Sequence, residues 1–220
     1  MEDGNQMINI LYEDNHLLVA LKPVNIPVCE DSSSDDDFLN MLKRYLEEKY
    51  NKKNAFLGLV HRLDRPVGGV MVFAKTSKAA SRLSDQIRKK EFEKKYYAVV
   101  CGKIPEKGRF VDKLEKDSKR NFSFVSENGK ESSLTFERIK TNGKYSLVSV
   151  SLETGRSHQI RVQFSSHGFP LYGDQKYNKK ANLHEQIALF AYFLSFIHPV
   201  KKERVTFEVD IPDIYPFNFS

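Results

Sequence analysis

The sequence predicts an α+β fold with a mixed, mostly antiparallel central sheet and flanking helices. Strand-like stretches outnumber helical ones and do not alternate regularly with them, as they would in a parallel α/β fold. Turn signals separate the short apolar runs between residues 110 and 145, which is typical of antiparallel hairpins. Because no repeat period or long linker divides the 220 residues, we expect a single domain over residues 1–220.

Three strands are expected in the N-terminal part of the chain. Residues 8–12 and 17–21 form two strand-like runs, and Glu13-Asp14-Asn15 forms the turn between them. Residues 70–74 form a short apolar run directly after Gly68-Gly69. This run is typical of a buried strand.

Two helices are expected in the same part. Residues 29–37 hold five acidic side chains and should form an exposed loop. The loop leads into a helix over Phe38–Tyr50, where acids suit the positive end of the helix dipole. Thr76 or Ser77 caps a second helix, which runs to about Lys90. Its inner face is expected to consist of Ala80, Leu83 and Ile87.

Strands dominate the rest of the chain. Besides the hairpins between residues 110 and 145, the expected strands are residues 95–101, 146–152, 189–197 and 205–211. One helix is expected over residues 157–167, with Ile160 and Phe164 four positions apart. Gly168 should end it in the left-handed conformation.

Composition excludes several classes of protein. Hydrophobic residues make up 40% and charged residues 29%, which is globular rather than disordered composition. The longest apolar stretch, residues 187–197, is too short to span a bilayer, and the N-terminus lacks the features of a signal peptide. Cys29 and Cys101 match no metal or disulfide spacing, so we expect reduced thiols in a cytoplasmic protein. A net charge of +6 permits a polyanionic partner.

The first segment that could carry chemistry is His61-Arg62-Leu63-Asp64-Arg65-Pro66. Two arginines flank Asp64, so its carboxylate should stay ionised and could serve as a base or nucleophile. A surface aspartate in a local ion pair is the alternative interpretation. No metal site is expected from His61 and Asp64, because no second cluster supplies further ligands.

The second segment is Thr154-Gly155-Arg156-Ser157-His158-Gln159-Ile160-Arg161. On a helix His158 and Arg161 lie on one face, and Arg156 with the free N–H groups of the first turn forms an anion site. An ordinary capped helix with solvated charges is the alternative. A Ser157–His158 hydrolase pair is disfavoured, because helix neighbours point about 100° apart and no nucleophile elbow occurs.

The third segment joins Arg88-Lys89-Lys90 to Lys94-Lys95-Tyr96-Tyr97. Basic residues beside aromatic ones suit phosphate contact and base stacking, although a solvated helix end that enters a half-buried strand has the same pattern. Successive strand residues face opposite sides, so one tyrosine is expected in the core and the other in a cleft. No phosphate-binding loop, dinucleotide fingerprint or zinc-deaminase signature occurs, so an enzyme with this sequence should need no cofactor.

These segments, in this order, resemble the RluA-type pseudouridine synthases, which isomerise uridine in ribosomal or transfer RNA. The resemblance covers more than half of the chain and implies the pseudouridine synthase fold with a basic active-site cleft. The matching stretches are Ile10-Leu11-Tyr12-Glu13-Asp14, Lys22-Pro23, His61-Arg62-Leu63-Asp64, residues 94–102, residues 154–161, residues 168–177 and residues 191–199.

The resemblance implies a role for each site residue. Asp64 is the catalytic carboxylate, Tyr96 stacks on the uracil, and Arg161 pairs with Asp64 and keeps it ionised. The target base must leave its stack, and Arg62 is placed to fill the space that it vacates. The remaining residues expected to contact RNA are His61, Arg156, His158 and Lys94. No metal or cofactor is implied.

The sequence departs from the family pattern at a few positions. Val67-Gly68-Gly69 follows the aspartate where the family usually has Thr-Ser-Gly, and Asn25, Asn178 and Phe190 also differ. None of these positions is Asp64, Tyr96 or Arg161. The chain starts almost directly at the catalytic part, so we expect no S4-type RNA-binding domain. We expect a monomer that recognises a stem-loop of ribosomal or transfer RNA.

Two other functions stay open at this point. One is a non-catalytic RNA-binding or RNA-folding protein with the same fold, against which the complete Asp, Tyr and Arg set argues. The other is a metal-dependent or serine hydrolase that acts on RNA, for which the sequence offers neither a ligand set nor an elbow.

Overall fold

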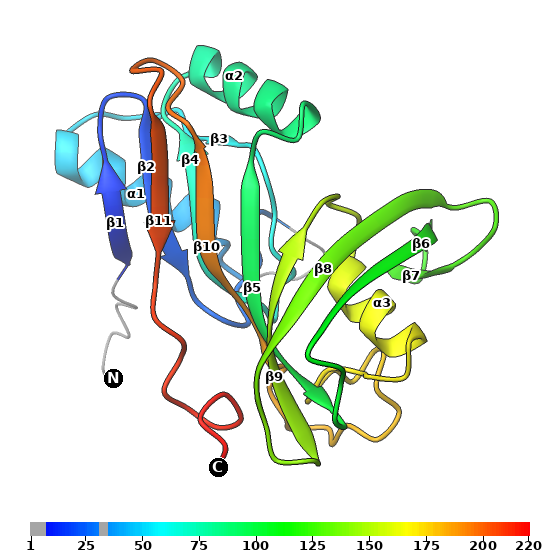
Figure 1. Cartoon of the computed structure of the whole chain (residues 1–220). Coiled ribbons are helices and arrows are strands. Elements are labelled where there is room, and N and C mark those ends of the chain that lie inside the picture. The colour runs from blue at the N-terminus through cyan, green and yellow to red at the C-terminus, as the bar shows by residue number, and fades with distance from the viewer. Residues whose placement is uncertain (1–7, 31–34) are drawn as a thin grey trace, which may run out of the picture. The chain divides into compact units, whose positions relative to one another are not determined.

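The computed structural model describes residues 8–30 and 35–220, which fold as two compact units (Figure 1). The first unit is formed by Met1–Phe92 and Leu194–Phe207, and the second by Glu93–Phe193 and Glu208–Ser220. Strand β10 (Leu189–Ile197) contributes its first residues to the second unit and its last residues to the first. Among the described residues, no helix has the length and the apolar composition needed to cross a membrane.

The first unit is built on a sheet with the strand order β1-β2-β4-β10, in which β3 also pairs with β4 and β11 with β10. Its other strands are β1 (Asn9–Glu13), β2 (Leu17–Lys22), β3 (Gly58–Leu59), β4 (Gly68–Ala74) and β11 (Arg204–Glu208). β2 and β4 are antiparallel, from the pair Leu17 with Ala74 to the pair Lys22 with Gly69. Every residue of β4 is buried, as its uninterrupted apolar run predicts.

Helix α1 (Phe38–Tyr50) has the predicted bounds, and its buried residues follow the four-residue spacing of one helix face. Asp37 caps it by accepting a hydrogen bond of 2.9 Å from the N–H of Asn40. Asp37 is 3% exposed, so the prediction of an exposed acidic loop is wrong at this residue, whose carboxylate satisfies the helix end. Residues 31–34 of the predicted loop lie outside the described residues.

Helix α2 (Ser77–Arg88) follows β4 and is capped by Thr76, as predicted. Its buried face consists of Ala79, Leu83 and Gln86. The predicted inner positions Ala80 and Ile87 are only half-buried. The helix is therefore turned by one position from the apolar pattern, because the amide of Gln86 pairs with the backbone N–H and C=O of Ile197 and is buried by doing so.

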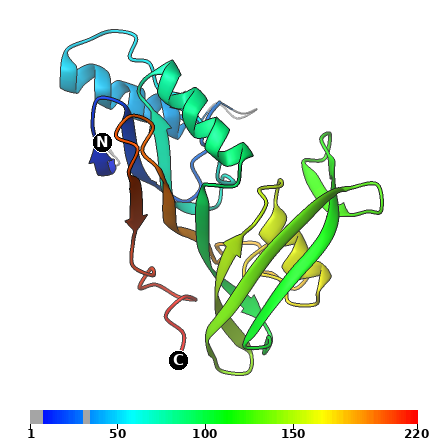
Figure 2. The same cartoon turned by 45° about the horizontal axis from the view of Figure 1, so that its top comes forward.

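The second unit carries a sheet of strand order β10-β5-β9-β8-β6-β7. The strands not yet described are β5 (Glu93–Cys101), β6 (Lys107–Asp117), β7 (Phe122–Val125), β8 (Lys130–Thr141) and β9 (Tyr145–Leu152). All their pairs with one another are antiparallel, which confirms the predicted hairpins. Figure 2 shows the long ribbon of β6 and β8, and α3 (Gln159–Ser166) lies against β6 and β7.

Helix α3 begins at Gln159, two residues later than predicted. His158 precedes it in the left-handed conformation, with φ 53°, and therefore cannot belong to the helix. Gly168 follows the helix with φ 85°, as predicted. The α+β class and the mostly antiparallel sheet are confirmed by this architecture.

Candidate active site

The loop between β3 and β4 carries Asp64 in the first unit. Leu63 and Val67 are buried on either side of it, 7% and 2% exposed, whereas the Asp64 side chain is half-buried. The N–H of Val67 donates to the carbonyl of Asp64 over 2.9 Å and closes a turn at residues 65 and 66. Two apolar anchors and this turn hold the carboxylate at the edge of solvent.

Lys22, at the end of β2, holds the same loop in place through hydrogen bonds to its backbone. Its side chain is 1% exposed, and its ammonium donates to the carbonyls of Arg65, Val67 and Pro23 over 3.1, 2.8 and 2.7 Å. Burial lowers the pKa of Lys22 to about 7, and the charge of Asp64 acts in the opposite direction. The lysine of the Lys22-Pro23 pair is thus a buried cation that joins β2 to the Asp64 loop.

The residues beside Asp64 differ in exposure. His61 is 8% exposed, and its Nε2 accepts a hydrogen bond of 3.1 Å from the N–H of Val72 in β4. Arg62 is exposed. Arg65 donates to the carbonyl of Asn25 over 3.2 Å and forms an ion pair with Asp35. The burial of His61 indicates that this residue holds the loop, whereas the exposed Arg62 is accessible to a ligand.

Strand β5 presents Lys94 and Tyr96 in the second unit. Tyr96 is 7% exposed and lies opposite Val150 of β9. Lys94 is half-buried, and burial lowers the pKa of its ammonium. Its Nζ lies against Gly155, only 3.4 Å from the position that a Cβ would take there. The strand therefore brings the predicted Lys94 to the turn that precedes α3.

The two tyrosines of β5 face opposite ways, as the strand pleat requires. Tyr97 stacks on Tyr192 with a centroid distance of 3.8 Å and packs against the apolar cluster of the second unit. The members of that cluster are Val99, Leu147, Ala188, Phe217 and Phe219. Tyr97 thus belongs to this core, which leaves Tyr96 on the other face of β5.

Gln159 organises the turn before α3. Its Oε1 accepts from the N–H of Arg156 over 3.0 Å and from the hydroxyl of Thr154 over 2.8 Å. The backbone N–H of Arg156 is therefore bonded within the turn, and the predicted anion site would have to use the Arg156 side chain and the first-turn N–H groups of the helix. The Arg156 guanidinium is exposed and donates to the carbonyl of Glu131 through Nε and Nη2, each over 3.2 Å.

Arg161 is held inside the second unit by Asp174. Its Nε and Nη2 donate to Oδ2 and Oδ1 of that carboxylate over 2.9 and 2.7 Å, and the two side chains are 7% and 0% exposed. Gly173 makes this possible, because its φ is 68° and a Cβ there would lie 2.3 Å from the carbonyl oxygen of Gln186. The two-bond geometry fixes the plane of the guanidinium.

Tyr177 brings Arg161 and His158 together. Its ring lies 5.1 Å from the guanidinium carbon of Arg161, and its hydroxyl lies 2.7 Å from Nδ1 of His158. The same hydroxyl accepts from the N–H of Ser123 over 2.8 Å, and Phe122 stacks on the ring at 4.8 Å. The predicted closeness of His158 and Arg161 therefore exists, but through Tyr177 and not through a shared helix face.

The structure thus places the predicted residues in two groups. His61, Arg62 and Asp64 lie in the first unit, and the second group is Lys94, Tyr96, Arg156, His158 and Arg161. No group of three His, Cys, Asp or Glu side chains that could hold a metal ion occurs within residues 8–30 and 35–220. Sequence reasoning gave no role to Lys22, Asp174 or Tyr177, although Lys22 follows an apolar run and such a lysine indicates a buried charge.

Comparison with known protein families shows to which family this chain belongs. Residues 16–166 match the profile of the RNA pseudouridylate synthase family. The chain belongs to the RNA pseudouridylate synthase family. The matched stretch includes Asp64, Tyr96 and Arg161, and it takes in parts of both units. Membership confirms the predicted resemblance.

Curated members of the family are similar along nearly the whole chain. The ribosomal large subunit pseudouridine synthase D of Neisseria meningitidis serogroup A is 34% identical over 221 residues, which are 94% of this chain and 59% of that protein. Synthase C of Buchnera aphidicola (subsp. Schizaphis graminum) is also 34% identical, over 94% of this chain and 69% of that protein. The chain thus spans about six to seven tenths of these relatives.

Solved structures of the same class share the fold. The human RNA pseudouridylate synthase domain containing 4 superposes with a TM-score of 0.79 and 22% sequence identity, over 93% of this chain and 89% of that one. The human RNA pseudouridylate synthase domain containing 1 gives a TM-score of 0.76 over 97% of this chain and 88% of that one. The predicted pseudouridine synthase fold is confirmed by this agreement.

Proposed function

We propose that this synthase converts specific uridines of ribosomal or transfer RNA to pseudouridine, with Asp64 as its catalytic carboxylate. One observation carries the proposal. The family match contains Asp64, and the loop of this residue is anchored by Leu63, Val67 and the buried ammonium of Lys22 while its carboxylate stays half-exposed. A carboxylate held in this way is positioned before a substrate arrives.

The reaction itself needs little beyond such a group. The bond from N1 of uracil to C1′ of the ribose breaks, the base turns, and C5 bonds to C1′. C5 loses its hydrogen as a proton, and N1 takes up a proton. Atoms and electrons balance within the nucleotide. A carboxylate can attack the sugar or base, or stabilise the positive charge that develops as the glycosidic bond breaks.

Two further residues complete the proposed catalytic set. Tyr96 stacks on the uracil and is placed to serve the later removal of the C5 proton. Arg161 keeps the reacting carboxylate ionised, and its pairing with Asp64 stays a prediction. The bidentate bond to Asp174 supports a fixed role for Arg161, because it fixes the plane of the guanidinium.

Recognition of the RNA is assigned to the basic and exposed residues of the two groups. Arg62 fills the space that the flipped base leaves, which offsets part of the few kcal/mol that flipping costs. Arg156, His158 and Lys94 bind phosphates, and His61 supports the loop. We place the enzyme in the cytoplasm as a monomer that acts on a stem-loop.

The first test is the release of tritium from C5-labelled uridine. Transfer RNA and ribosomal RNA from cells that lack this gene are treated separately with the wild-type protein and with Asp64→Asn. Wild-type release from one pool, with none from Asp64→Asn, is the expected result. Asp210→Asn is the matched control, because Asp210 is exposed and the substitution makes the same chemical change.

The other outcomes are equally informative. Turnover by purified Asp64→Asn would remove Asp64 from its role, and wild-type turnover by Arg161→Met would show that another arginine serves the carboxylate. No release from either pool, with RNA binding intact, would favour a non-catalytic RNA-binding protein. Binding should also weaken steeply with salt, because Lys and Arg contacts to phosphates release counterions.

A further inference from the structure

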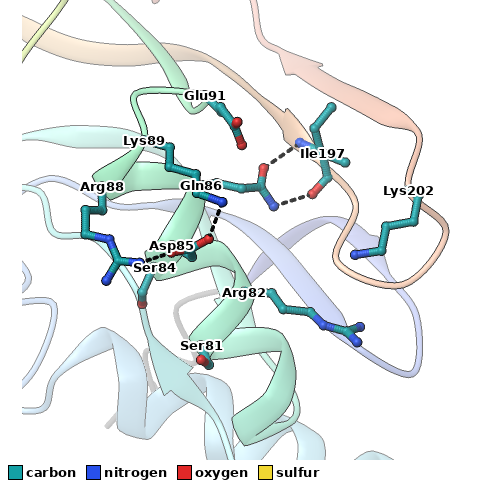
Figure 3. A pocket seen from close by; sticks show the side chains of 10 residues that line it. All are labelled: Ser81, Arg82, Ser84, Asp85, Gln86, Arg88, Lys89, Glu91, Ile197 and Lys202. Carbon is teal, nitrogen blue, oxygen red and sulfur yellow. Dashed lines mark hydrogen bonds and ion pairs between the residues drawn. The ribbon is translucent and has the colours of Figure 1, made fainter.

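A second basic feature of the first unit lies outside the residues assigned so far. A pocket of about 530 Å³ is formed between the last turns of α2 and the turn from β10 to β11 (Figure 3). It contains none of the residues assigned to catalysis. Four of its ten lining residues are cationic and two are acidic, the cations being Arg82, Arg88, Lys89 and Lys202 and the acids Asp85 and Glu91.

The walls of this pocket are tied together by hydrogen bonds. The amide of Gln86 donates to the carbonyl of Ile197 over 2.7 Å and accepts from its N–H over 2.8 Å. Arg82 donates to the carbonyl of Pro199 over 2.7 Å. Three bonds therefore join α2 to the end of β10, and the cations project from a preformed surface.

The opposite wall is fixed by a buried histidine. Nδ1 of His198 accepts from the N–H groups of Val200 and Lys201 over 3.1 and 3.0 Å, and its Nε2 lies 2.9 Å from Asp14. Lys202 adopts the left-handed conformation, φ 64°, and its N–H donates to the carbonyl of His198 over 3.0 Å. Figure 3 shows the side chain of Lys202 extending from this turn toward α2.

The cations of the α2 wall are exposed and only weakly paired. Arg88 and Lys89 share one partner, Asp85, and their side chains are 79% and 57% exposed. Exposed pairs of this kind contribute little to stability, so both cations can turn to a stronger anion. None of the ten residues drawn in Figure 3 is aromatic, so the pocket offers charge and hydrogen-bond donors but no surface for base stacking.

We propose that this pocket, with Arg88, Lys89 and Lys202 as its contacts, binds backbone phosphates of the substrate RNA. The inference rests on the proposed function, because it takes the RNA of the reaction as the ligand. Its contribution is independent of sequence, since phosphate contacts position an RNA and base contacts specify it. Arg82 and Gln86 hold the walls and leave the anion to the other three cations.

The test changes the charge of the pocket in both directions. RNA binding is measured on an Asp64→Asn background, with the transfer or ribosomal RNA from which the wild type releases tritium. We expect about tenfold weaker binding from the triple variant Arg88→Gln, Lys89→Gln, Lys202→Gln. The plot of log K against log salt has a negative slope, and its magnitude should decrease by about 2–3. Asp85→Asn removes the acidic partner of Arg88 and Lys89, so this variant should bind RNA more tightly and show a slope of larger magnitude.

Matched controls separate the pocket from net charge. Lys43→Gln, Lys52→Gln, Lys53→Gln removes the same charge from α1 and the turn after it, in the same unit, and Asp213→Asn matches Asp85→Asn. Control variants should change binding only slightly. If the pocket triple variant equals the lysine control in affinity and slope, the proposal is overturned, and an anionic protein would become the better candidate ligand. Failure of the proposed function is distinct, because then the wild type releases no tritium at all.

Discussion

Asp174 holds Arg161 through both of its carboxylate oxygens, and neither side chain is more than 7% exposed. The pair makes Asp174 part of the support of a residue that we place at the reacting carboxylate. A rigid guanidinium matters because a shift of about 1 Å in such a group can cost two orders of magnitude in rate. Substitutions at Asp174 and at Tyr177, which lies against Arg161, test this support.

Asp174→Asn should weaken both activity and stability. The amide has nearly the shape of the carboxylate but no charge, so Arg161 stays buried without its counterion. Breaking a buried pair in this way costs about 3–5 kcal/mol, and an amide that keeps one hydrogen bond should place the loss near the lower value. Urea unfolding and tritium release measure the two effects. Asp210→Asn, at an exposed position, should leave both unchanged within error, and a stable, fully active Asp174→Asn would contradict the support role.

Tyr177→Phe should separate the ring of Tyr177 from its hydroxyl. The ring contacts with Arg161 and Phe122 remain, whereas the N–H of the buried Ser123 loses its acceptor and Nδ1 of His158 loses its contact with the hydroxyl. A buried donor without a partner costs about 1–3 kcal/mol, which urea unfolding can detect. Tyr50→Phe removes a hydroxyl that bonds Glu13, but the carboxylate keeps Lys49 and Lys75 as donors, so the change should be below about 0.5 kcal/mol. Equal effects of the two variants would show that the Ser123 bond contributes nothing.

The buried Lys22 predicts a rise of stability with pH. Its pKa is lowered to about 7 in the folded chain, whereas an unfolded lysine titrates near its model-peptide value of about 10.4. Between these values the unfolded chain binds more protons, so the free energy of unfolding of the wild type should rise relative to Lys22→Met as pH increases. The slope of the difference is at most about 1.4 kcal/mol per pH unit. Below pH 7 this slope should vanish, and the exposed Lys52→Met serves as the control variant. A flat difference from pH 7 to 10 would show that the three carbonyls keep Lys22 charged throughout.

Asp14 predicts a loss of stability in acid. Burial alone would raise its pKa, but hydrogen bonds from the N–H groups of His16 and Leu17, the hydroxyl of Tyr12 and the ring of His198 lower it to about 2. The carboxylate therefore stabilises the fold above about pH 4 and loses this contribution as pH falls toward 2. We expect about 1–2 kcal/mol, because its side chain is 19% exposed and partly screened. The difference in free energy of unfolding between the wild type and Asp14→Asn should disappear as pH falls over this range. A constant difference would contradict the lowered pKa of Asp14.

Local patterns predicted the elements that local forces determine. Helix α1 and strand β10 have the predicted bounds, because an N-cap, a four-residue apolar spacing and a continuous apolar run act within a few residues. Thr76 caps the start of α2 and Gly168 follows the end of α3, both as expected and for the same reason. The site residues Asp64, Tyr96 and Arg161 were found from the order of motifs along the chain, and their roles remain predictions.

Residues whose partners lie far away in sequence could not be assigned in this way. Gln86 is buried because Ile197 offers it a backbone N–H and C=O across 111 positions, so the face of α2 that packs differs from its apolar pattern. The same holds for Lys22, whose carbonyl acceptors in Arg65 and Val67 lie 43 and 45 positions away. A polar side chain can be buried wherever tertiary structure supplies partners.

The sequence by itself determined the fold class and the family, because hydrophobic spacing and motif order are properties of the chain, and it predicted Asp64 as the reacting carboxylate. Only the tertiary structure decided that Asp174 and Tyr177 hold Arg161, that Lys22 ties β2 to the Asp64 loop, and that α2 and the β10–β11 turn enclose a basic pocket. The physical reason is that a buried charge or hydrogen-bonding group is stabilised by partners within about 3 Å, and only folding brings those partners together.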